Sequence, residues 1–579
     1  MKKPIVAAWI VLTAAIAAPS PAQVKDFKPI TQQMLLEPSA DDWLMYSRTY
    51  DAQRFSPLSQ INVENAGTLA EAWSKPLDAG TIESIPLVHN GVLYAMVPRV
   101  TPDGTKTAMM AINGATGELL WEYVRPTGGM TRSKSFGVFE DLVIFTGADN
   151  FIVAVDASSG ELRWETESSG GLTAGAVIAG DKVITGRSCG AEQAHCYIAA
   201  HDAKTGAEAW RFYTAAGSDD PAGDATWAGV PVATRVASTW GLGGSYDPLN
   251  KMIYWGVANP SPYTRLERHG APDAVSLTAP VDLYSNSTVA INLETGKLSW
   301  YYQHLPGDDW DQDYTNERIL LRTPISPDAS EVKWANPDVL KGEVHDVAVN
   351  VGEGGGLFVL DRISGQFLWA NPFPYDVENF LISDIEPRTG RTTINFDAVL
   401  KGPGDRKIIC AYNTKSYWPM SYHPGNNSLY IPYVDDCLDM TSASADGTQR
   451  QRRVGVRRPG SDPKKYAGIA KVNVETGKID RIYEGPVPGN GATLVTAGNV
   501  LFWGDLGQKF RAFDAESGKI LWETKVSGPI QNSTITYAVN GKQYVAVVTG
   551  TGLMTRSLFG NAGIDPDLNN TIHVFALPE

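Results

Sequence analysis

The residues best suited to chemistry in this chain are four aspartates in one short segment, "LPGDDWDQDYTNE", residues 305–317. Asp308, Asp309, Asp311 and Asp313 surround a single tryptophan. Like charges at this density repel one another and raise each other's pKa. Such a segment is stable where a cation binds it or where it lies in open water. It therefore predicts either a metal-dependent site or a solvated loop.

The first residues have the composition of a secretory signal peptide. Lysines at positions 2 and 3 precede an apolar run to about Ala18, and small residues offer a cleavage point before Gln23. We expect residues 1–22 to be removed and residues 23–579 to form the exported, periplasmic protein. The run is too short to span a membrane, and no later segment of the sequence has the ~18 uncharged apolar residues of a spanning helix.

Charge and cysteine content narrow the functional classes. The formal net charge is −15, and the one basic run, residues 450–458, is expected to be a solvated loop, so the composition argues against a nucleic-acid partner. Cys189, Cys196, Cys410 and Cys437 are an even set in an exported chain, which predicts two disulfide bonds. Of the three connectivities, pairing of near neighbours is the simplest. The sequence has no motif for attaching a c-type haem or for binding zinc.

One sequence pattern recurs seven times, with Asp or Asn two residues after its start, Gly six after and usually Trp ten after. The copies begin at Ala111, Ala154, Ala200, Ala290, Val359, Lys471 and Ala512. Apolar alternation that leads into an Asp/Asn–Gly turn is typical of a β-hairpin, and the Trp on the second strand can cover a neighbouring repeat. Some Gly-to-Gly spacings, 43, 46 and 41 residues, match a four-stranded propeller blade.

The ends of the chain add to this repeat. Larger gaps between some copies require insertions or a blade that has lost the motif. A weaker copy near Trp73 and a closing strand at residues 572–579 raise the expected number of blades to eight. We predict an all-β fold, one eight-bladed β-propeller over residues 23–579, in which the terminal strand completes the first blade and removes a free sheet edge.

The repeat resembles the tryptophan-docking motif of the quinoprotein alcohol dehydrogenases, which are eight-bladed propellers that hold pyrroloquinoline quinone (PQQ). Residues 47–73, 256–263 and 540–552 resemble the opening, the asparagine loop and the final blade of that family, so the resemblance covers nearly all of residues 23–579. It implies oxidation of an alcohol by a PQQ- and metal-dependent enzyme. Electrons would pass to a separate soluble cytochrome c, since this chain has no haem motif, and a homodimer is compatible with the resemblance.

The resemblance implies a metal site built from Glu192, Asn259 and Asp311. PQQ is a flat, tricarboxylated ortho-quinone whose reactive carbonyl requires a Lewis acid, and a carboxylate must take the proton of the alcohol. Asp311 matches the catalytic base of the family. Asp313 stands where lanthanide-dependent members carry a second Asp and calcium-dependent members do not, and an added carboxylate suits a trivalent ion. Calcium and a lanthanide both remain open. The other two aspartates of the segment, Asp308 and Asp309, are expected to lie at the entrance or to support the ligands from behind, with solvated loop residues as the alternative.

The resemblance also implies a set of cofactor contacts. Trp240 matches the tryptophan that stacks under the PQQ plane, and Glu83 matches the glutamate at the edge of the cofactor. The remaining matched positions supply donors near PQQ: Arg132 or Lys134, Thr173, Gly190, Ala191 and Asn413.

Three departures from the family pattern bear on specificity. The adjacent cysteines of the family are absent from residues 125–134, and Cys189 and Cys196 are candidates for a ring beside the metal loop instead. Glu353 or a neighbouring glycine stands where the family has Lys or Arg before "FVLDR", and "GTGLMT" replaces a Gly-Trp-Gly near the C-terminus. Loss of that aromatic wall predicts a roomier pocket, suited to a bulky primary or secondary alcohol.

Two alternative functions remain. A quinoprotein that oxidises a sugar or an aldehyde would use the same machinery on another substrate. A non-catalytic propeller scaffold would account for the repeats. It would not account for the metal-site and cofactor residues that occur in matching contexts.

Overall fold

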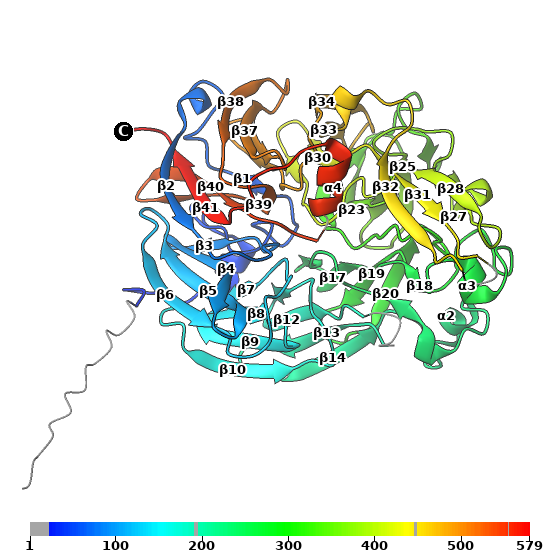
Figure 1. Ribbon diagram of the computed structural model, residues 1–579, viewed down its shortest axis with the longest axis horizontal. Coiled ribbons are helices and arrows are strands. Elements are labelled where there is room, and N and C mark those ends of the chain that lie inside the picture. Colours follow the sequence, from blue (N-terminus) through cyan, green and yellow to red (C-terminus); the bar gives the residue numbers. More distant parts are fainter. Residues whose placement is uncertain (1–22, 190–194, 445–447, 554) are drawn as a thin grey trace, which may run out of the picture.

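The computed structural model of the protein describes residues 23–189, 195–444, 448–553 and 555–579. Strands dominate, and the helices of these ranges are short: α1 (Gln32–Leu36), α2 (Pro221–Ala225), α3 (Arg265–His269) and α4 (Thr555–Ala562). Figure 1 shows the sheets arranged one after another around a common centre, in sequence order. No helix in the described ranges is both long enough and apolar enough to cross a lipid bilayer.

The first four sheets are antiparallel and their strands follow in chain order, with β18 (Pro260–Ser261) alone set aside from the fourth sheet. They are β3 (Leu87–His89), β4 (Val92–Thr101), β5 (Gly104–Asn113) and β6 (Leu119–Val124); β7 (Gly137–Phe139), β8 (Leu142–Thr146), β9 (Phe151–Asp156) and β10 (Leu162–Glu167); β11 (Ala176–Ala179), β12 (Lys182–Gly186), β13 (Tyr197–Asp202) and β14 (Glu208–Tyr213); and β16 (Ser245–Asp247), β17 (Met252–Gly256), β19 (Ser287–Asn292) and β20 (Leu298–Gln303).

Four further sheets of four or five strands continue the series. They are β21 (Ile319–Ile325), β23 (Glu343–Gly352), β24 (Gly355–Asp361) and β25 (Phe367–Asn371) with β22 (Trp334–Ala335); β29 (Ser421–His423), β30 (Ser428–Val434), β33 (Ala467–Asn473) and β34 (Ile479–Gly485); β35 (Leu494–Thr496), β36 (Val500–Gly504), β37 (Lys509–Asp514) and β38 (Ile520–Lys525) with β1 (Phe55–Ser56); and β39 (Ile530–Val539), β40 (Lys542–Thr549) and β41 (Thr571–Ala576) with β2 (Ala70–Pro76). The all-β architecture is confirmed, and a closed ring of eight blades stays a prediction.

The two ends of the described chain meet in the last sheet. Strand β2 pairs antiparallel with β41, from Ala70 opposite Ala576 to Pro76 opposite Thr571. The sheet thus consists of three C-terminal strands with an N-terminal strand at its edge. The expected pairing of the chain ends is present, but it completes the last sheet rather than the first. Completing the last sheet has the same effect as completing the first would have: β41 is not a free sheet edge, because its backbone groups are paired on both sides.

The repeated tryptophans join consecutive sheets. Trp121 on β6 donates its indole N–H to the carbonyl of Ala157 in the next sheet at 3.0 Å, and its ring lies over Gly160, whose φ is +75°. The same bond joins Trp73 to Gly114, Trp210 to Leu293, Trp300 to Arg362 and Trp369 to Val474. The predicted hairpin turn with a left-handed glycine, and the Trp that covers the neighbouring repeat, are confirmed.

The two large gaps in the repeat contain insertions. Between β14 and β19 lie α2, α3 and the paired strands β15 (Val236–Ala237) and β18 (Pro260–Ser261). Between β25 and β33 lie the pair β26 (Ile382–Ile385) and β27 (Thr392–Ile394) and the three-stranded sheet β28 (Arg406–Cys410), β31 (Asp436–Thr441) and β32 (Arg452–Arg457). The predicted disulfides are both formed. Cys410 pairs with Cys437 and so joins β28 to β31, and Cys189 pairs with Cys196.

Contact with the docking tryptophan is testable at Gly160. An alanine Cβ there would lie 2.6 Å from the Trp121 ring, whereas at Gly541, with a similar φ of +76°, nothing lies within 4 Å. Gly541→Ala should cost only the left-handed strain of about 1 kcal/mol. Gly160→Ala should cost about 1–3 kcal/mol more because the ring must shift. Thermal unfolding of the two variants measures the difference, and equal losses of Tm would rule out the docking contact.

Candidate active site

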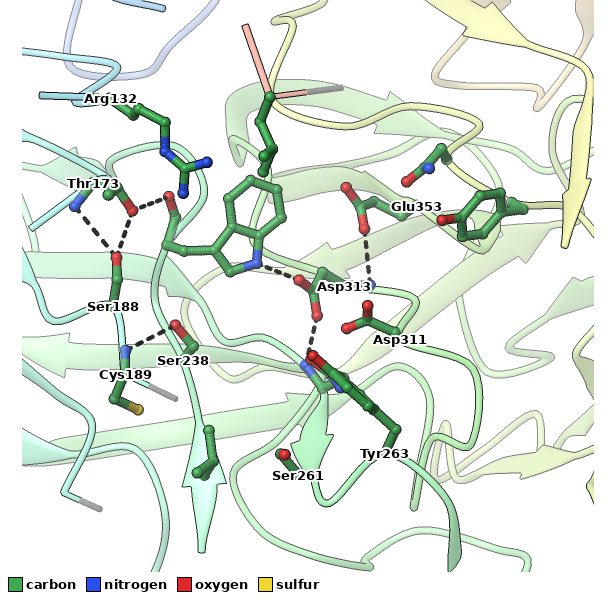
Figure 2. Close-up of a pocket in the computed structure, with 16 residues that line it drawn as sticks. Arg132, Thr173, Ser188, Cys189, Ser238, Ser261, Tyr263, Asp311, Asp313 and Glu353 are labelled. Carbon is green, nitrogen blue, oxygen red and sulfur yellow. Dashed lines mark hydrogen bonds between the residues drawn. The ribbon is translucent and has the colours of Figure 1, made fainter. Parts of the chain in front are cut away.

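A cavity of about 540 Å³ opens where loops from successive sheets converge. Eight predicted site residues line it: Arg132, Thr173, Cys189, Trp240, Asn259, Asp311, Asp313 and Asn413. In Figure 2, Arg132 and Thr173 lie on the opposite side of the view from Asp311, Asp313 and Glu353. Arg132 and Asn413 are 281 positions apart in sequence and yet line the same cavity, because blade-end loops meet at the centre of a propeller.

Asp313 makes direct contact with two of the other predicted residues. Its Oδ1 accepts the backbone N–H of Asn259 at 2.7 Å, and its Oδ2 accepts the indole N–H of Trp240. The side chain is buried, and burial together with the charge of Asp311 raises the pKa of Asp313 to about 8. Hydrogen bonds thus join Trp240, the candidate cofactor floor, to the candidate metal ligands Asn259 and Asp313.

Asp311 makes an ion pair that was not predicted from the sequence. The guanidinium of Arg453 on β32 donates Nη1 to its Oδ2 and Nη2 to the carbonyl of Trp310 at 3.0 Å. The basic run was expected to be a solvated loop. That expectation is wrong for this residue, whose side chain is only 20% exposed. The spacing of the arginines gave no signal, and only the charge of the aspartate segment indicated that a cation must lie nearby.

Two basic residues lie toward the other end of the site. Arg132 lines the cavity, while Lys134 is buried and pairs with Glu83 at 3.1 Å. The Lys134 ammonium also lies 5.2 Å from the ring centroid of Trp240. Burial lowers the pKa of Lys134, and Glu83 opposes that shift. Of the two alternatives near the cofactor, Arg132 faces the cavity and Lys134 supports the Trp240 ring.

Thr173 ties the cofactor floor to a neighbouring sheet. Its hydroxyl donates to the carbonyl of Trp240 at 3.0 Å, and its backbone N–H donates to the hydroxyl of Ser188 at 3.3 Å. The position of Trp240 is therefore fixed at the backbone by Thr173 and at the indole by Asp313.

Glu353 brings a third carboxylate to the cavity. It is 4% exposed, accepts a hydrogen bond from the Ser416 hydroxyl and receives the backbone N–H of Asp313 at 3.4 Å. Burial raises its pKa well above the usual range, and the charge of Asp313 adds to the shift. Glu353, rather than a glycine beside it, therefore faces the site.

Asp308 is buried and holds the loop that carries Asp311. Its Oδ1 accepts the backbone N–H of Trp310 at 2.5 Å. Its Oδ2 accepts the N–H of Gln312 and the side-chain amide of Asn286, each at 2.8 Å. The expectation of an entrance group or a solvated residue is wrong, because this carboxylate is 0% exposed, and its contacts agree with the alternative of a supporting group.

Asp309 is equally buried and ties the same loop to the inserted segments. It accepts the backbone N–H of Arg265 in α3 and that of Leu400 at 3.0 Å. Burial raises its pKa to about 6. Asp309 therefore has a structural role as well, and of the four aspartates only Asp311 and Asp313 line the cavity.

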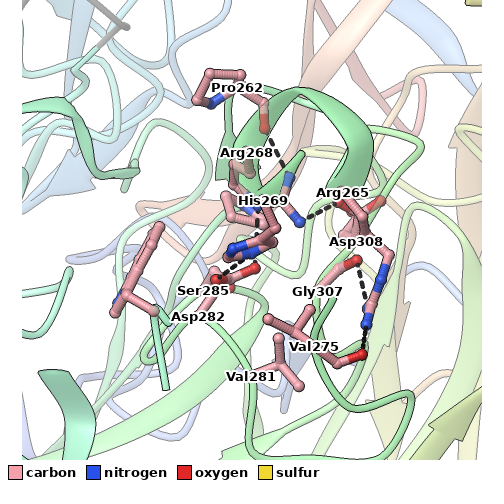
Figure 3. A network of polar contacts seen from close by, with 12 residues as sticks. Pro262, Arg265, Arg268, His269, Val275, Val281, Asp282, Ser285, Gly307 and Asp308 are labelled. Carbon is pink, nitrogen blue, oxygen red and sulfur yellow. Dashed lines mark hydrogen bonds and ion pairs between the residues drawn. The ribbon is translucent and has the colours of Figure 1, made fainter. Parts of the chain in front are cut away.

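A network around α3 braces this loop from behind (Figure 3). Arg268 donates to the carbonyl of Asp308 at 3.1 Å and pairs with buried Asp282 at 3.0 Å. His269 contacts the second oxygen of Asp282, also at 3.0 Å, and Arg265 donates to the carbonyl of Gly307 at 3.3 Å. The arginines hold backbone carbonyls of the aspartate loop, so its conformation does not depend on its own short turns alone.

Three predicted residues, Gly190, Ala191 and Glu192, lie outside the described residues. Within the described ranges, no group of three or more His, Cys, Asp or Glu side chains has an arrangement that could hold a metal ion. The metal site predicted from Glu192, Asn259, Asp311 and Asp313 therefore stays a prediction.

The cavity fits a planar anionic cofactor with a cation. Its volume of about 540 Å³ lies within the roughly 300–1,000 Å³ of small-molecule sites. Arg132 and the hydroxyl of Thr173 suit carboxylates at one side. Asp311, Asp313 and Glu353 gather three carboxyl groups at the other, where a metal ion would favour their ionised forms. This pairing of a flat indole, donors and crowded carboxylates is the chemistry of a cofactor-dependent oxidoreductase.

Comparison with known sequences identifies the family. The model for "Glucose/ethanol/alcohol dehydrogenase, beta-propeller domain" (PQQ) matches residues 165–371 and 465–545, and that for outer membrane protein assembly factor BamB matches residues 58–188. The dehydrogenase subunit of a quinone alcohol dehydrogenase from Gluconobacter oxydans (strain 621H) is 30% identical over 587 residues, covering 90% of this chain and 72% of that one. The chain belongs to the PQQ-dependent alcohol dehydrogenase family and is an oxidoreductase, which favours the enzyme over the scaffold.

Solved structures agree on the fold. Quinohemoprotein alcohol dehydrogenase ADHIIG from Pseudomonas putida HK5 superposes with a TM-score of 0.78 at 25% identity, covering 97% of this chain and 83% of that one. A europium-containing methanol dehydrogenase gives a TM-score of 0.79 at 24% identity over 94% and 99% of the two chains. The second likeness shows the fold alone, and both confirm a β-propeller.

The structural role of Asp308 gives a stability prediction. Asp308→Ala removes the acceptor of two backbone N–H groups and one amide in a dry environment and should destabilise the fold by about 2–3 kcal/mol. Asp384→Ala, on the exposed part of β26, is the control and should leave Tm unchanged. Thermal unfolding compares them, and an unaltered Tm in Asp308→Ala would contradict the anchoring role.

Proposed function

We propose that the mature protein, residues 23–579 after removal of residues 1–22 in the periplasm, is an eight-bladed, PQQ- and metal-dependent dehydrogenase of a bulky primary or secondary alcohol. A separate soluble cytochrome c takes its electrons. The proposal rests on one observation: Trp240, Asn259 and Asp313 are joined by hydrogen bonds and line one cavity together with Asp311.

The residues of the cavity divide into holding and reacting groups. Trp240 provides the aromatic surface, and Arg132, Thr173 and Asn413 provide donors for carboxylates of the cofactor. The bound PQQ and metal supply a hydride acceptor and a Lewis acid. Asp311 takes the hydroxyl proton of the alcohol, for which a carboxylate at the cavity wall is suited.

The choice of metal rests on the number of carboxylates. Asp313 adds a second carboxylate to Asp311, and hard oxygen ligands of high total charge favour a trivalent ion over calcium. The europium in the methanol dehydrogenase of similar fold is consistent with a lanthanide at such a site. We propose that this chain takes either ion and that Asp313 biases the site toward a lanthanide.

The wall of the cavity supports a bulky substrate. Leu553 lines it, together with the small or aliphatic side chains of Ser261 and Val236. Leu553 lies in the segment where the family resemblance implies an aromatic wall, and an aliphatic side chain there leaves more room for an alcohol with substituents beyond the reacting carbon.

A substrate panel tests the proposal as a whole. The protein is reconstituted with PQQ and either Ca²⁺ or a light lanthanide, and dye-linked oxidation is measured for alcohols of increasing size, for aldose sugars and for aldehydes. We expect kcat/KM to be higher for bulky alcohols than for methanol or ethanol. A preference for sugars or aldehydes would favour the alternative substrate class, and no oxidation of any compound would refute the enzyme.

The role of Asp311 as the base is tested by Asp311→Asn. The amide cannot take a proton, so turnover should fall by about 10²–10⁴-fold. PQQ binding, followed by quenching of tryptophan fluorescence, should be largely retained because the cavity floor is unchanged. An Asp311→Asn enzyme that turns over at the wild-type rate would remove Asp311 from the mechanism.

Asp313→Ala separates the two metals. Loss of this carboxylate should weaken activation by a lanthanide about tenfold or more and activation by Ca²⁺ less. The measurement is the metal concentration that gives half-maximal activity for each ion. Equal losses for both ions would show that Asp313 has no part in the choice of metal.

A further inference from the structure

The sheet β28–β31–β32 lies outside the blade sheets and forms part of the roof of the active site. The Cys410–Cys437 disulfide joins two of its strands. Its third strand, β32, is fixed to the C-terminal helix α4, because Arg457 donates to the carbonyl of Asn561 at 2.7 Å. Figure 1 shows β32 beside α4. The backbone of β32 is therefore held in place, and an arginine on this strand extends from a fixed backbone.

Alternation along β32 turns Arg453 and its neighbour to opposite sides. Arg452 is 57% exposed and pairs with Asp439 at 3.1 Å. Arg453 is 20% exposed and reaches Asp311 instead. The two adjacent arginines share strand, charge and size, and only one of them enters the site.

Three contacts fix the Arg453 guanidinium. Nη1 donates to Oδ2 of Asp311, and Nη2 donates to the carbonyl of Trp310 at 3.0 Å. Its central carbon lies 4.9 Å from the ring centroid of Tyr263, which also lines the cavity. A guanidinium held at its two terminal nitrogens and on its face has little rotational freedom, so it fixes the direction of the carboxylate that it binds.

The contact between Arg453 and Asp311 matters because other acidic side chains line the same cavity. Asp313 and Glu353 line the same cavity as Asp311, and a negative charge placed on either of them would repel its carboxylate. Arg453 holds one oxygen in place. It also competes with any other cation for that oxygen, because both are attracted to the same negative charge.

We propose that Arg453 is a positioning residue for Asp311. It orients the carboxylate for proton transfer, and it weakens the hold of the site on its metal ion. The inference rests on the proposed function, in which Asp311 is the base. It assigns to the inserted sheet a part in catalysis that none of the blade sheets supplies.

The test compares Arg453→Ala and Arg453→Lys with Arg452→Ala as the matched control. In Arg453→Ala we expect kcat to fall about 10- to 100-fold, because a freed carboxylate is misplaced, with a smaller change in KM. Arg453→Lys keeps the positive charge but loses the paired N–H donors of the guanidinium, so its kcat should lie between those of the wild type and Arg453→Ala. Guanidinium chloride at low millimolar concentration, but not sodium chloride, should restore part of the lost kcat. Arg452→Ala should match the wild type.

A binding measurement gives a readout that loss of structural support would not produce. Metal is titrated at fixed PQQ, and cofactor binding is followed by quenching of tryptophan fluorescence without substrate. Removing a competing cation should shift half-saturation in Arg453→Ala to lower metal concentration, by about two- to fivefold. A variant that only loosens the roof would shift it to higher concentration.

The outcomes separate the inference from the proposed function. A wild-type kcat, or a metal midpoint that is unchanged or higher in Arg453→Ala, overturns the positioning role while alcohol oxidation by the wild type stands. If Arg453→Ala has a collapsed Tm, Arg453→Lys decides by the same two measurements. If the wild type binds PQQ and metal but oxidises no alcohol, the proposed function fails, and the midpoint shift still reports whether Arg453 competes with the metal.

Discussion

Burial of a carboxylate-rich loop at the centre of the molecule is the constraint on which the site depends. Asp308 and Asp309 are fully buried, and a buried carboxylate is stable only when its oxygens are hydrogen-bonded. Backbone N–H groups of the same loop, of α3 and of Leu400 supply those bonds. The cost of burying charge thus fixes the conformation of the segment, so that two further aspartates of the same run are presented to the cavity.

The docking tryptophans give this loop a rigid frame. Five of these indoles donate to a carbonyl of the following repeat, as Trp300 does to Arg362 at 3.1 Å, so those neighbouring sheets are held by packing and by a directional bond at once. Loops at the inner ends of the sheets are then brought together without any direct link between them in sequence. This is how Thr173, Trp240 and Asp313 come to share hydrogen bonds.

The sequence predicted what depends on local pattern and missed what depends on long-range pairing. The hairpin repeats, the left-handed glycines such as Gly160, the near-neighbour disulfides and eight of the cavity residues follow from spacing or from the family resemblance. Whether an aspartate faces water or the interior does not, because its partners come from distant segments: Asp309 meets Leu400, 91 positions later. Arg453 was missed for the same reason, since its partner lies 142 positions away.

Two features of this chain, the acidic residue Glu353 and the inserted sheet, both change the charge around the cavity. Glu353 places a carboxylate where the family resemblance implies a Lys or Arg, and so adds a third acidic side chain to the cavity that Asp311 and Asp313 line. Arg453 restores one positive charge from β32, in a sheet that the repeats do not contain. An insertion outside the repeats thus supplies a positive charge to Asp311 in the cavity to which Glu353 adds an acidic side chain.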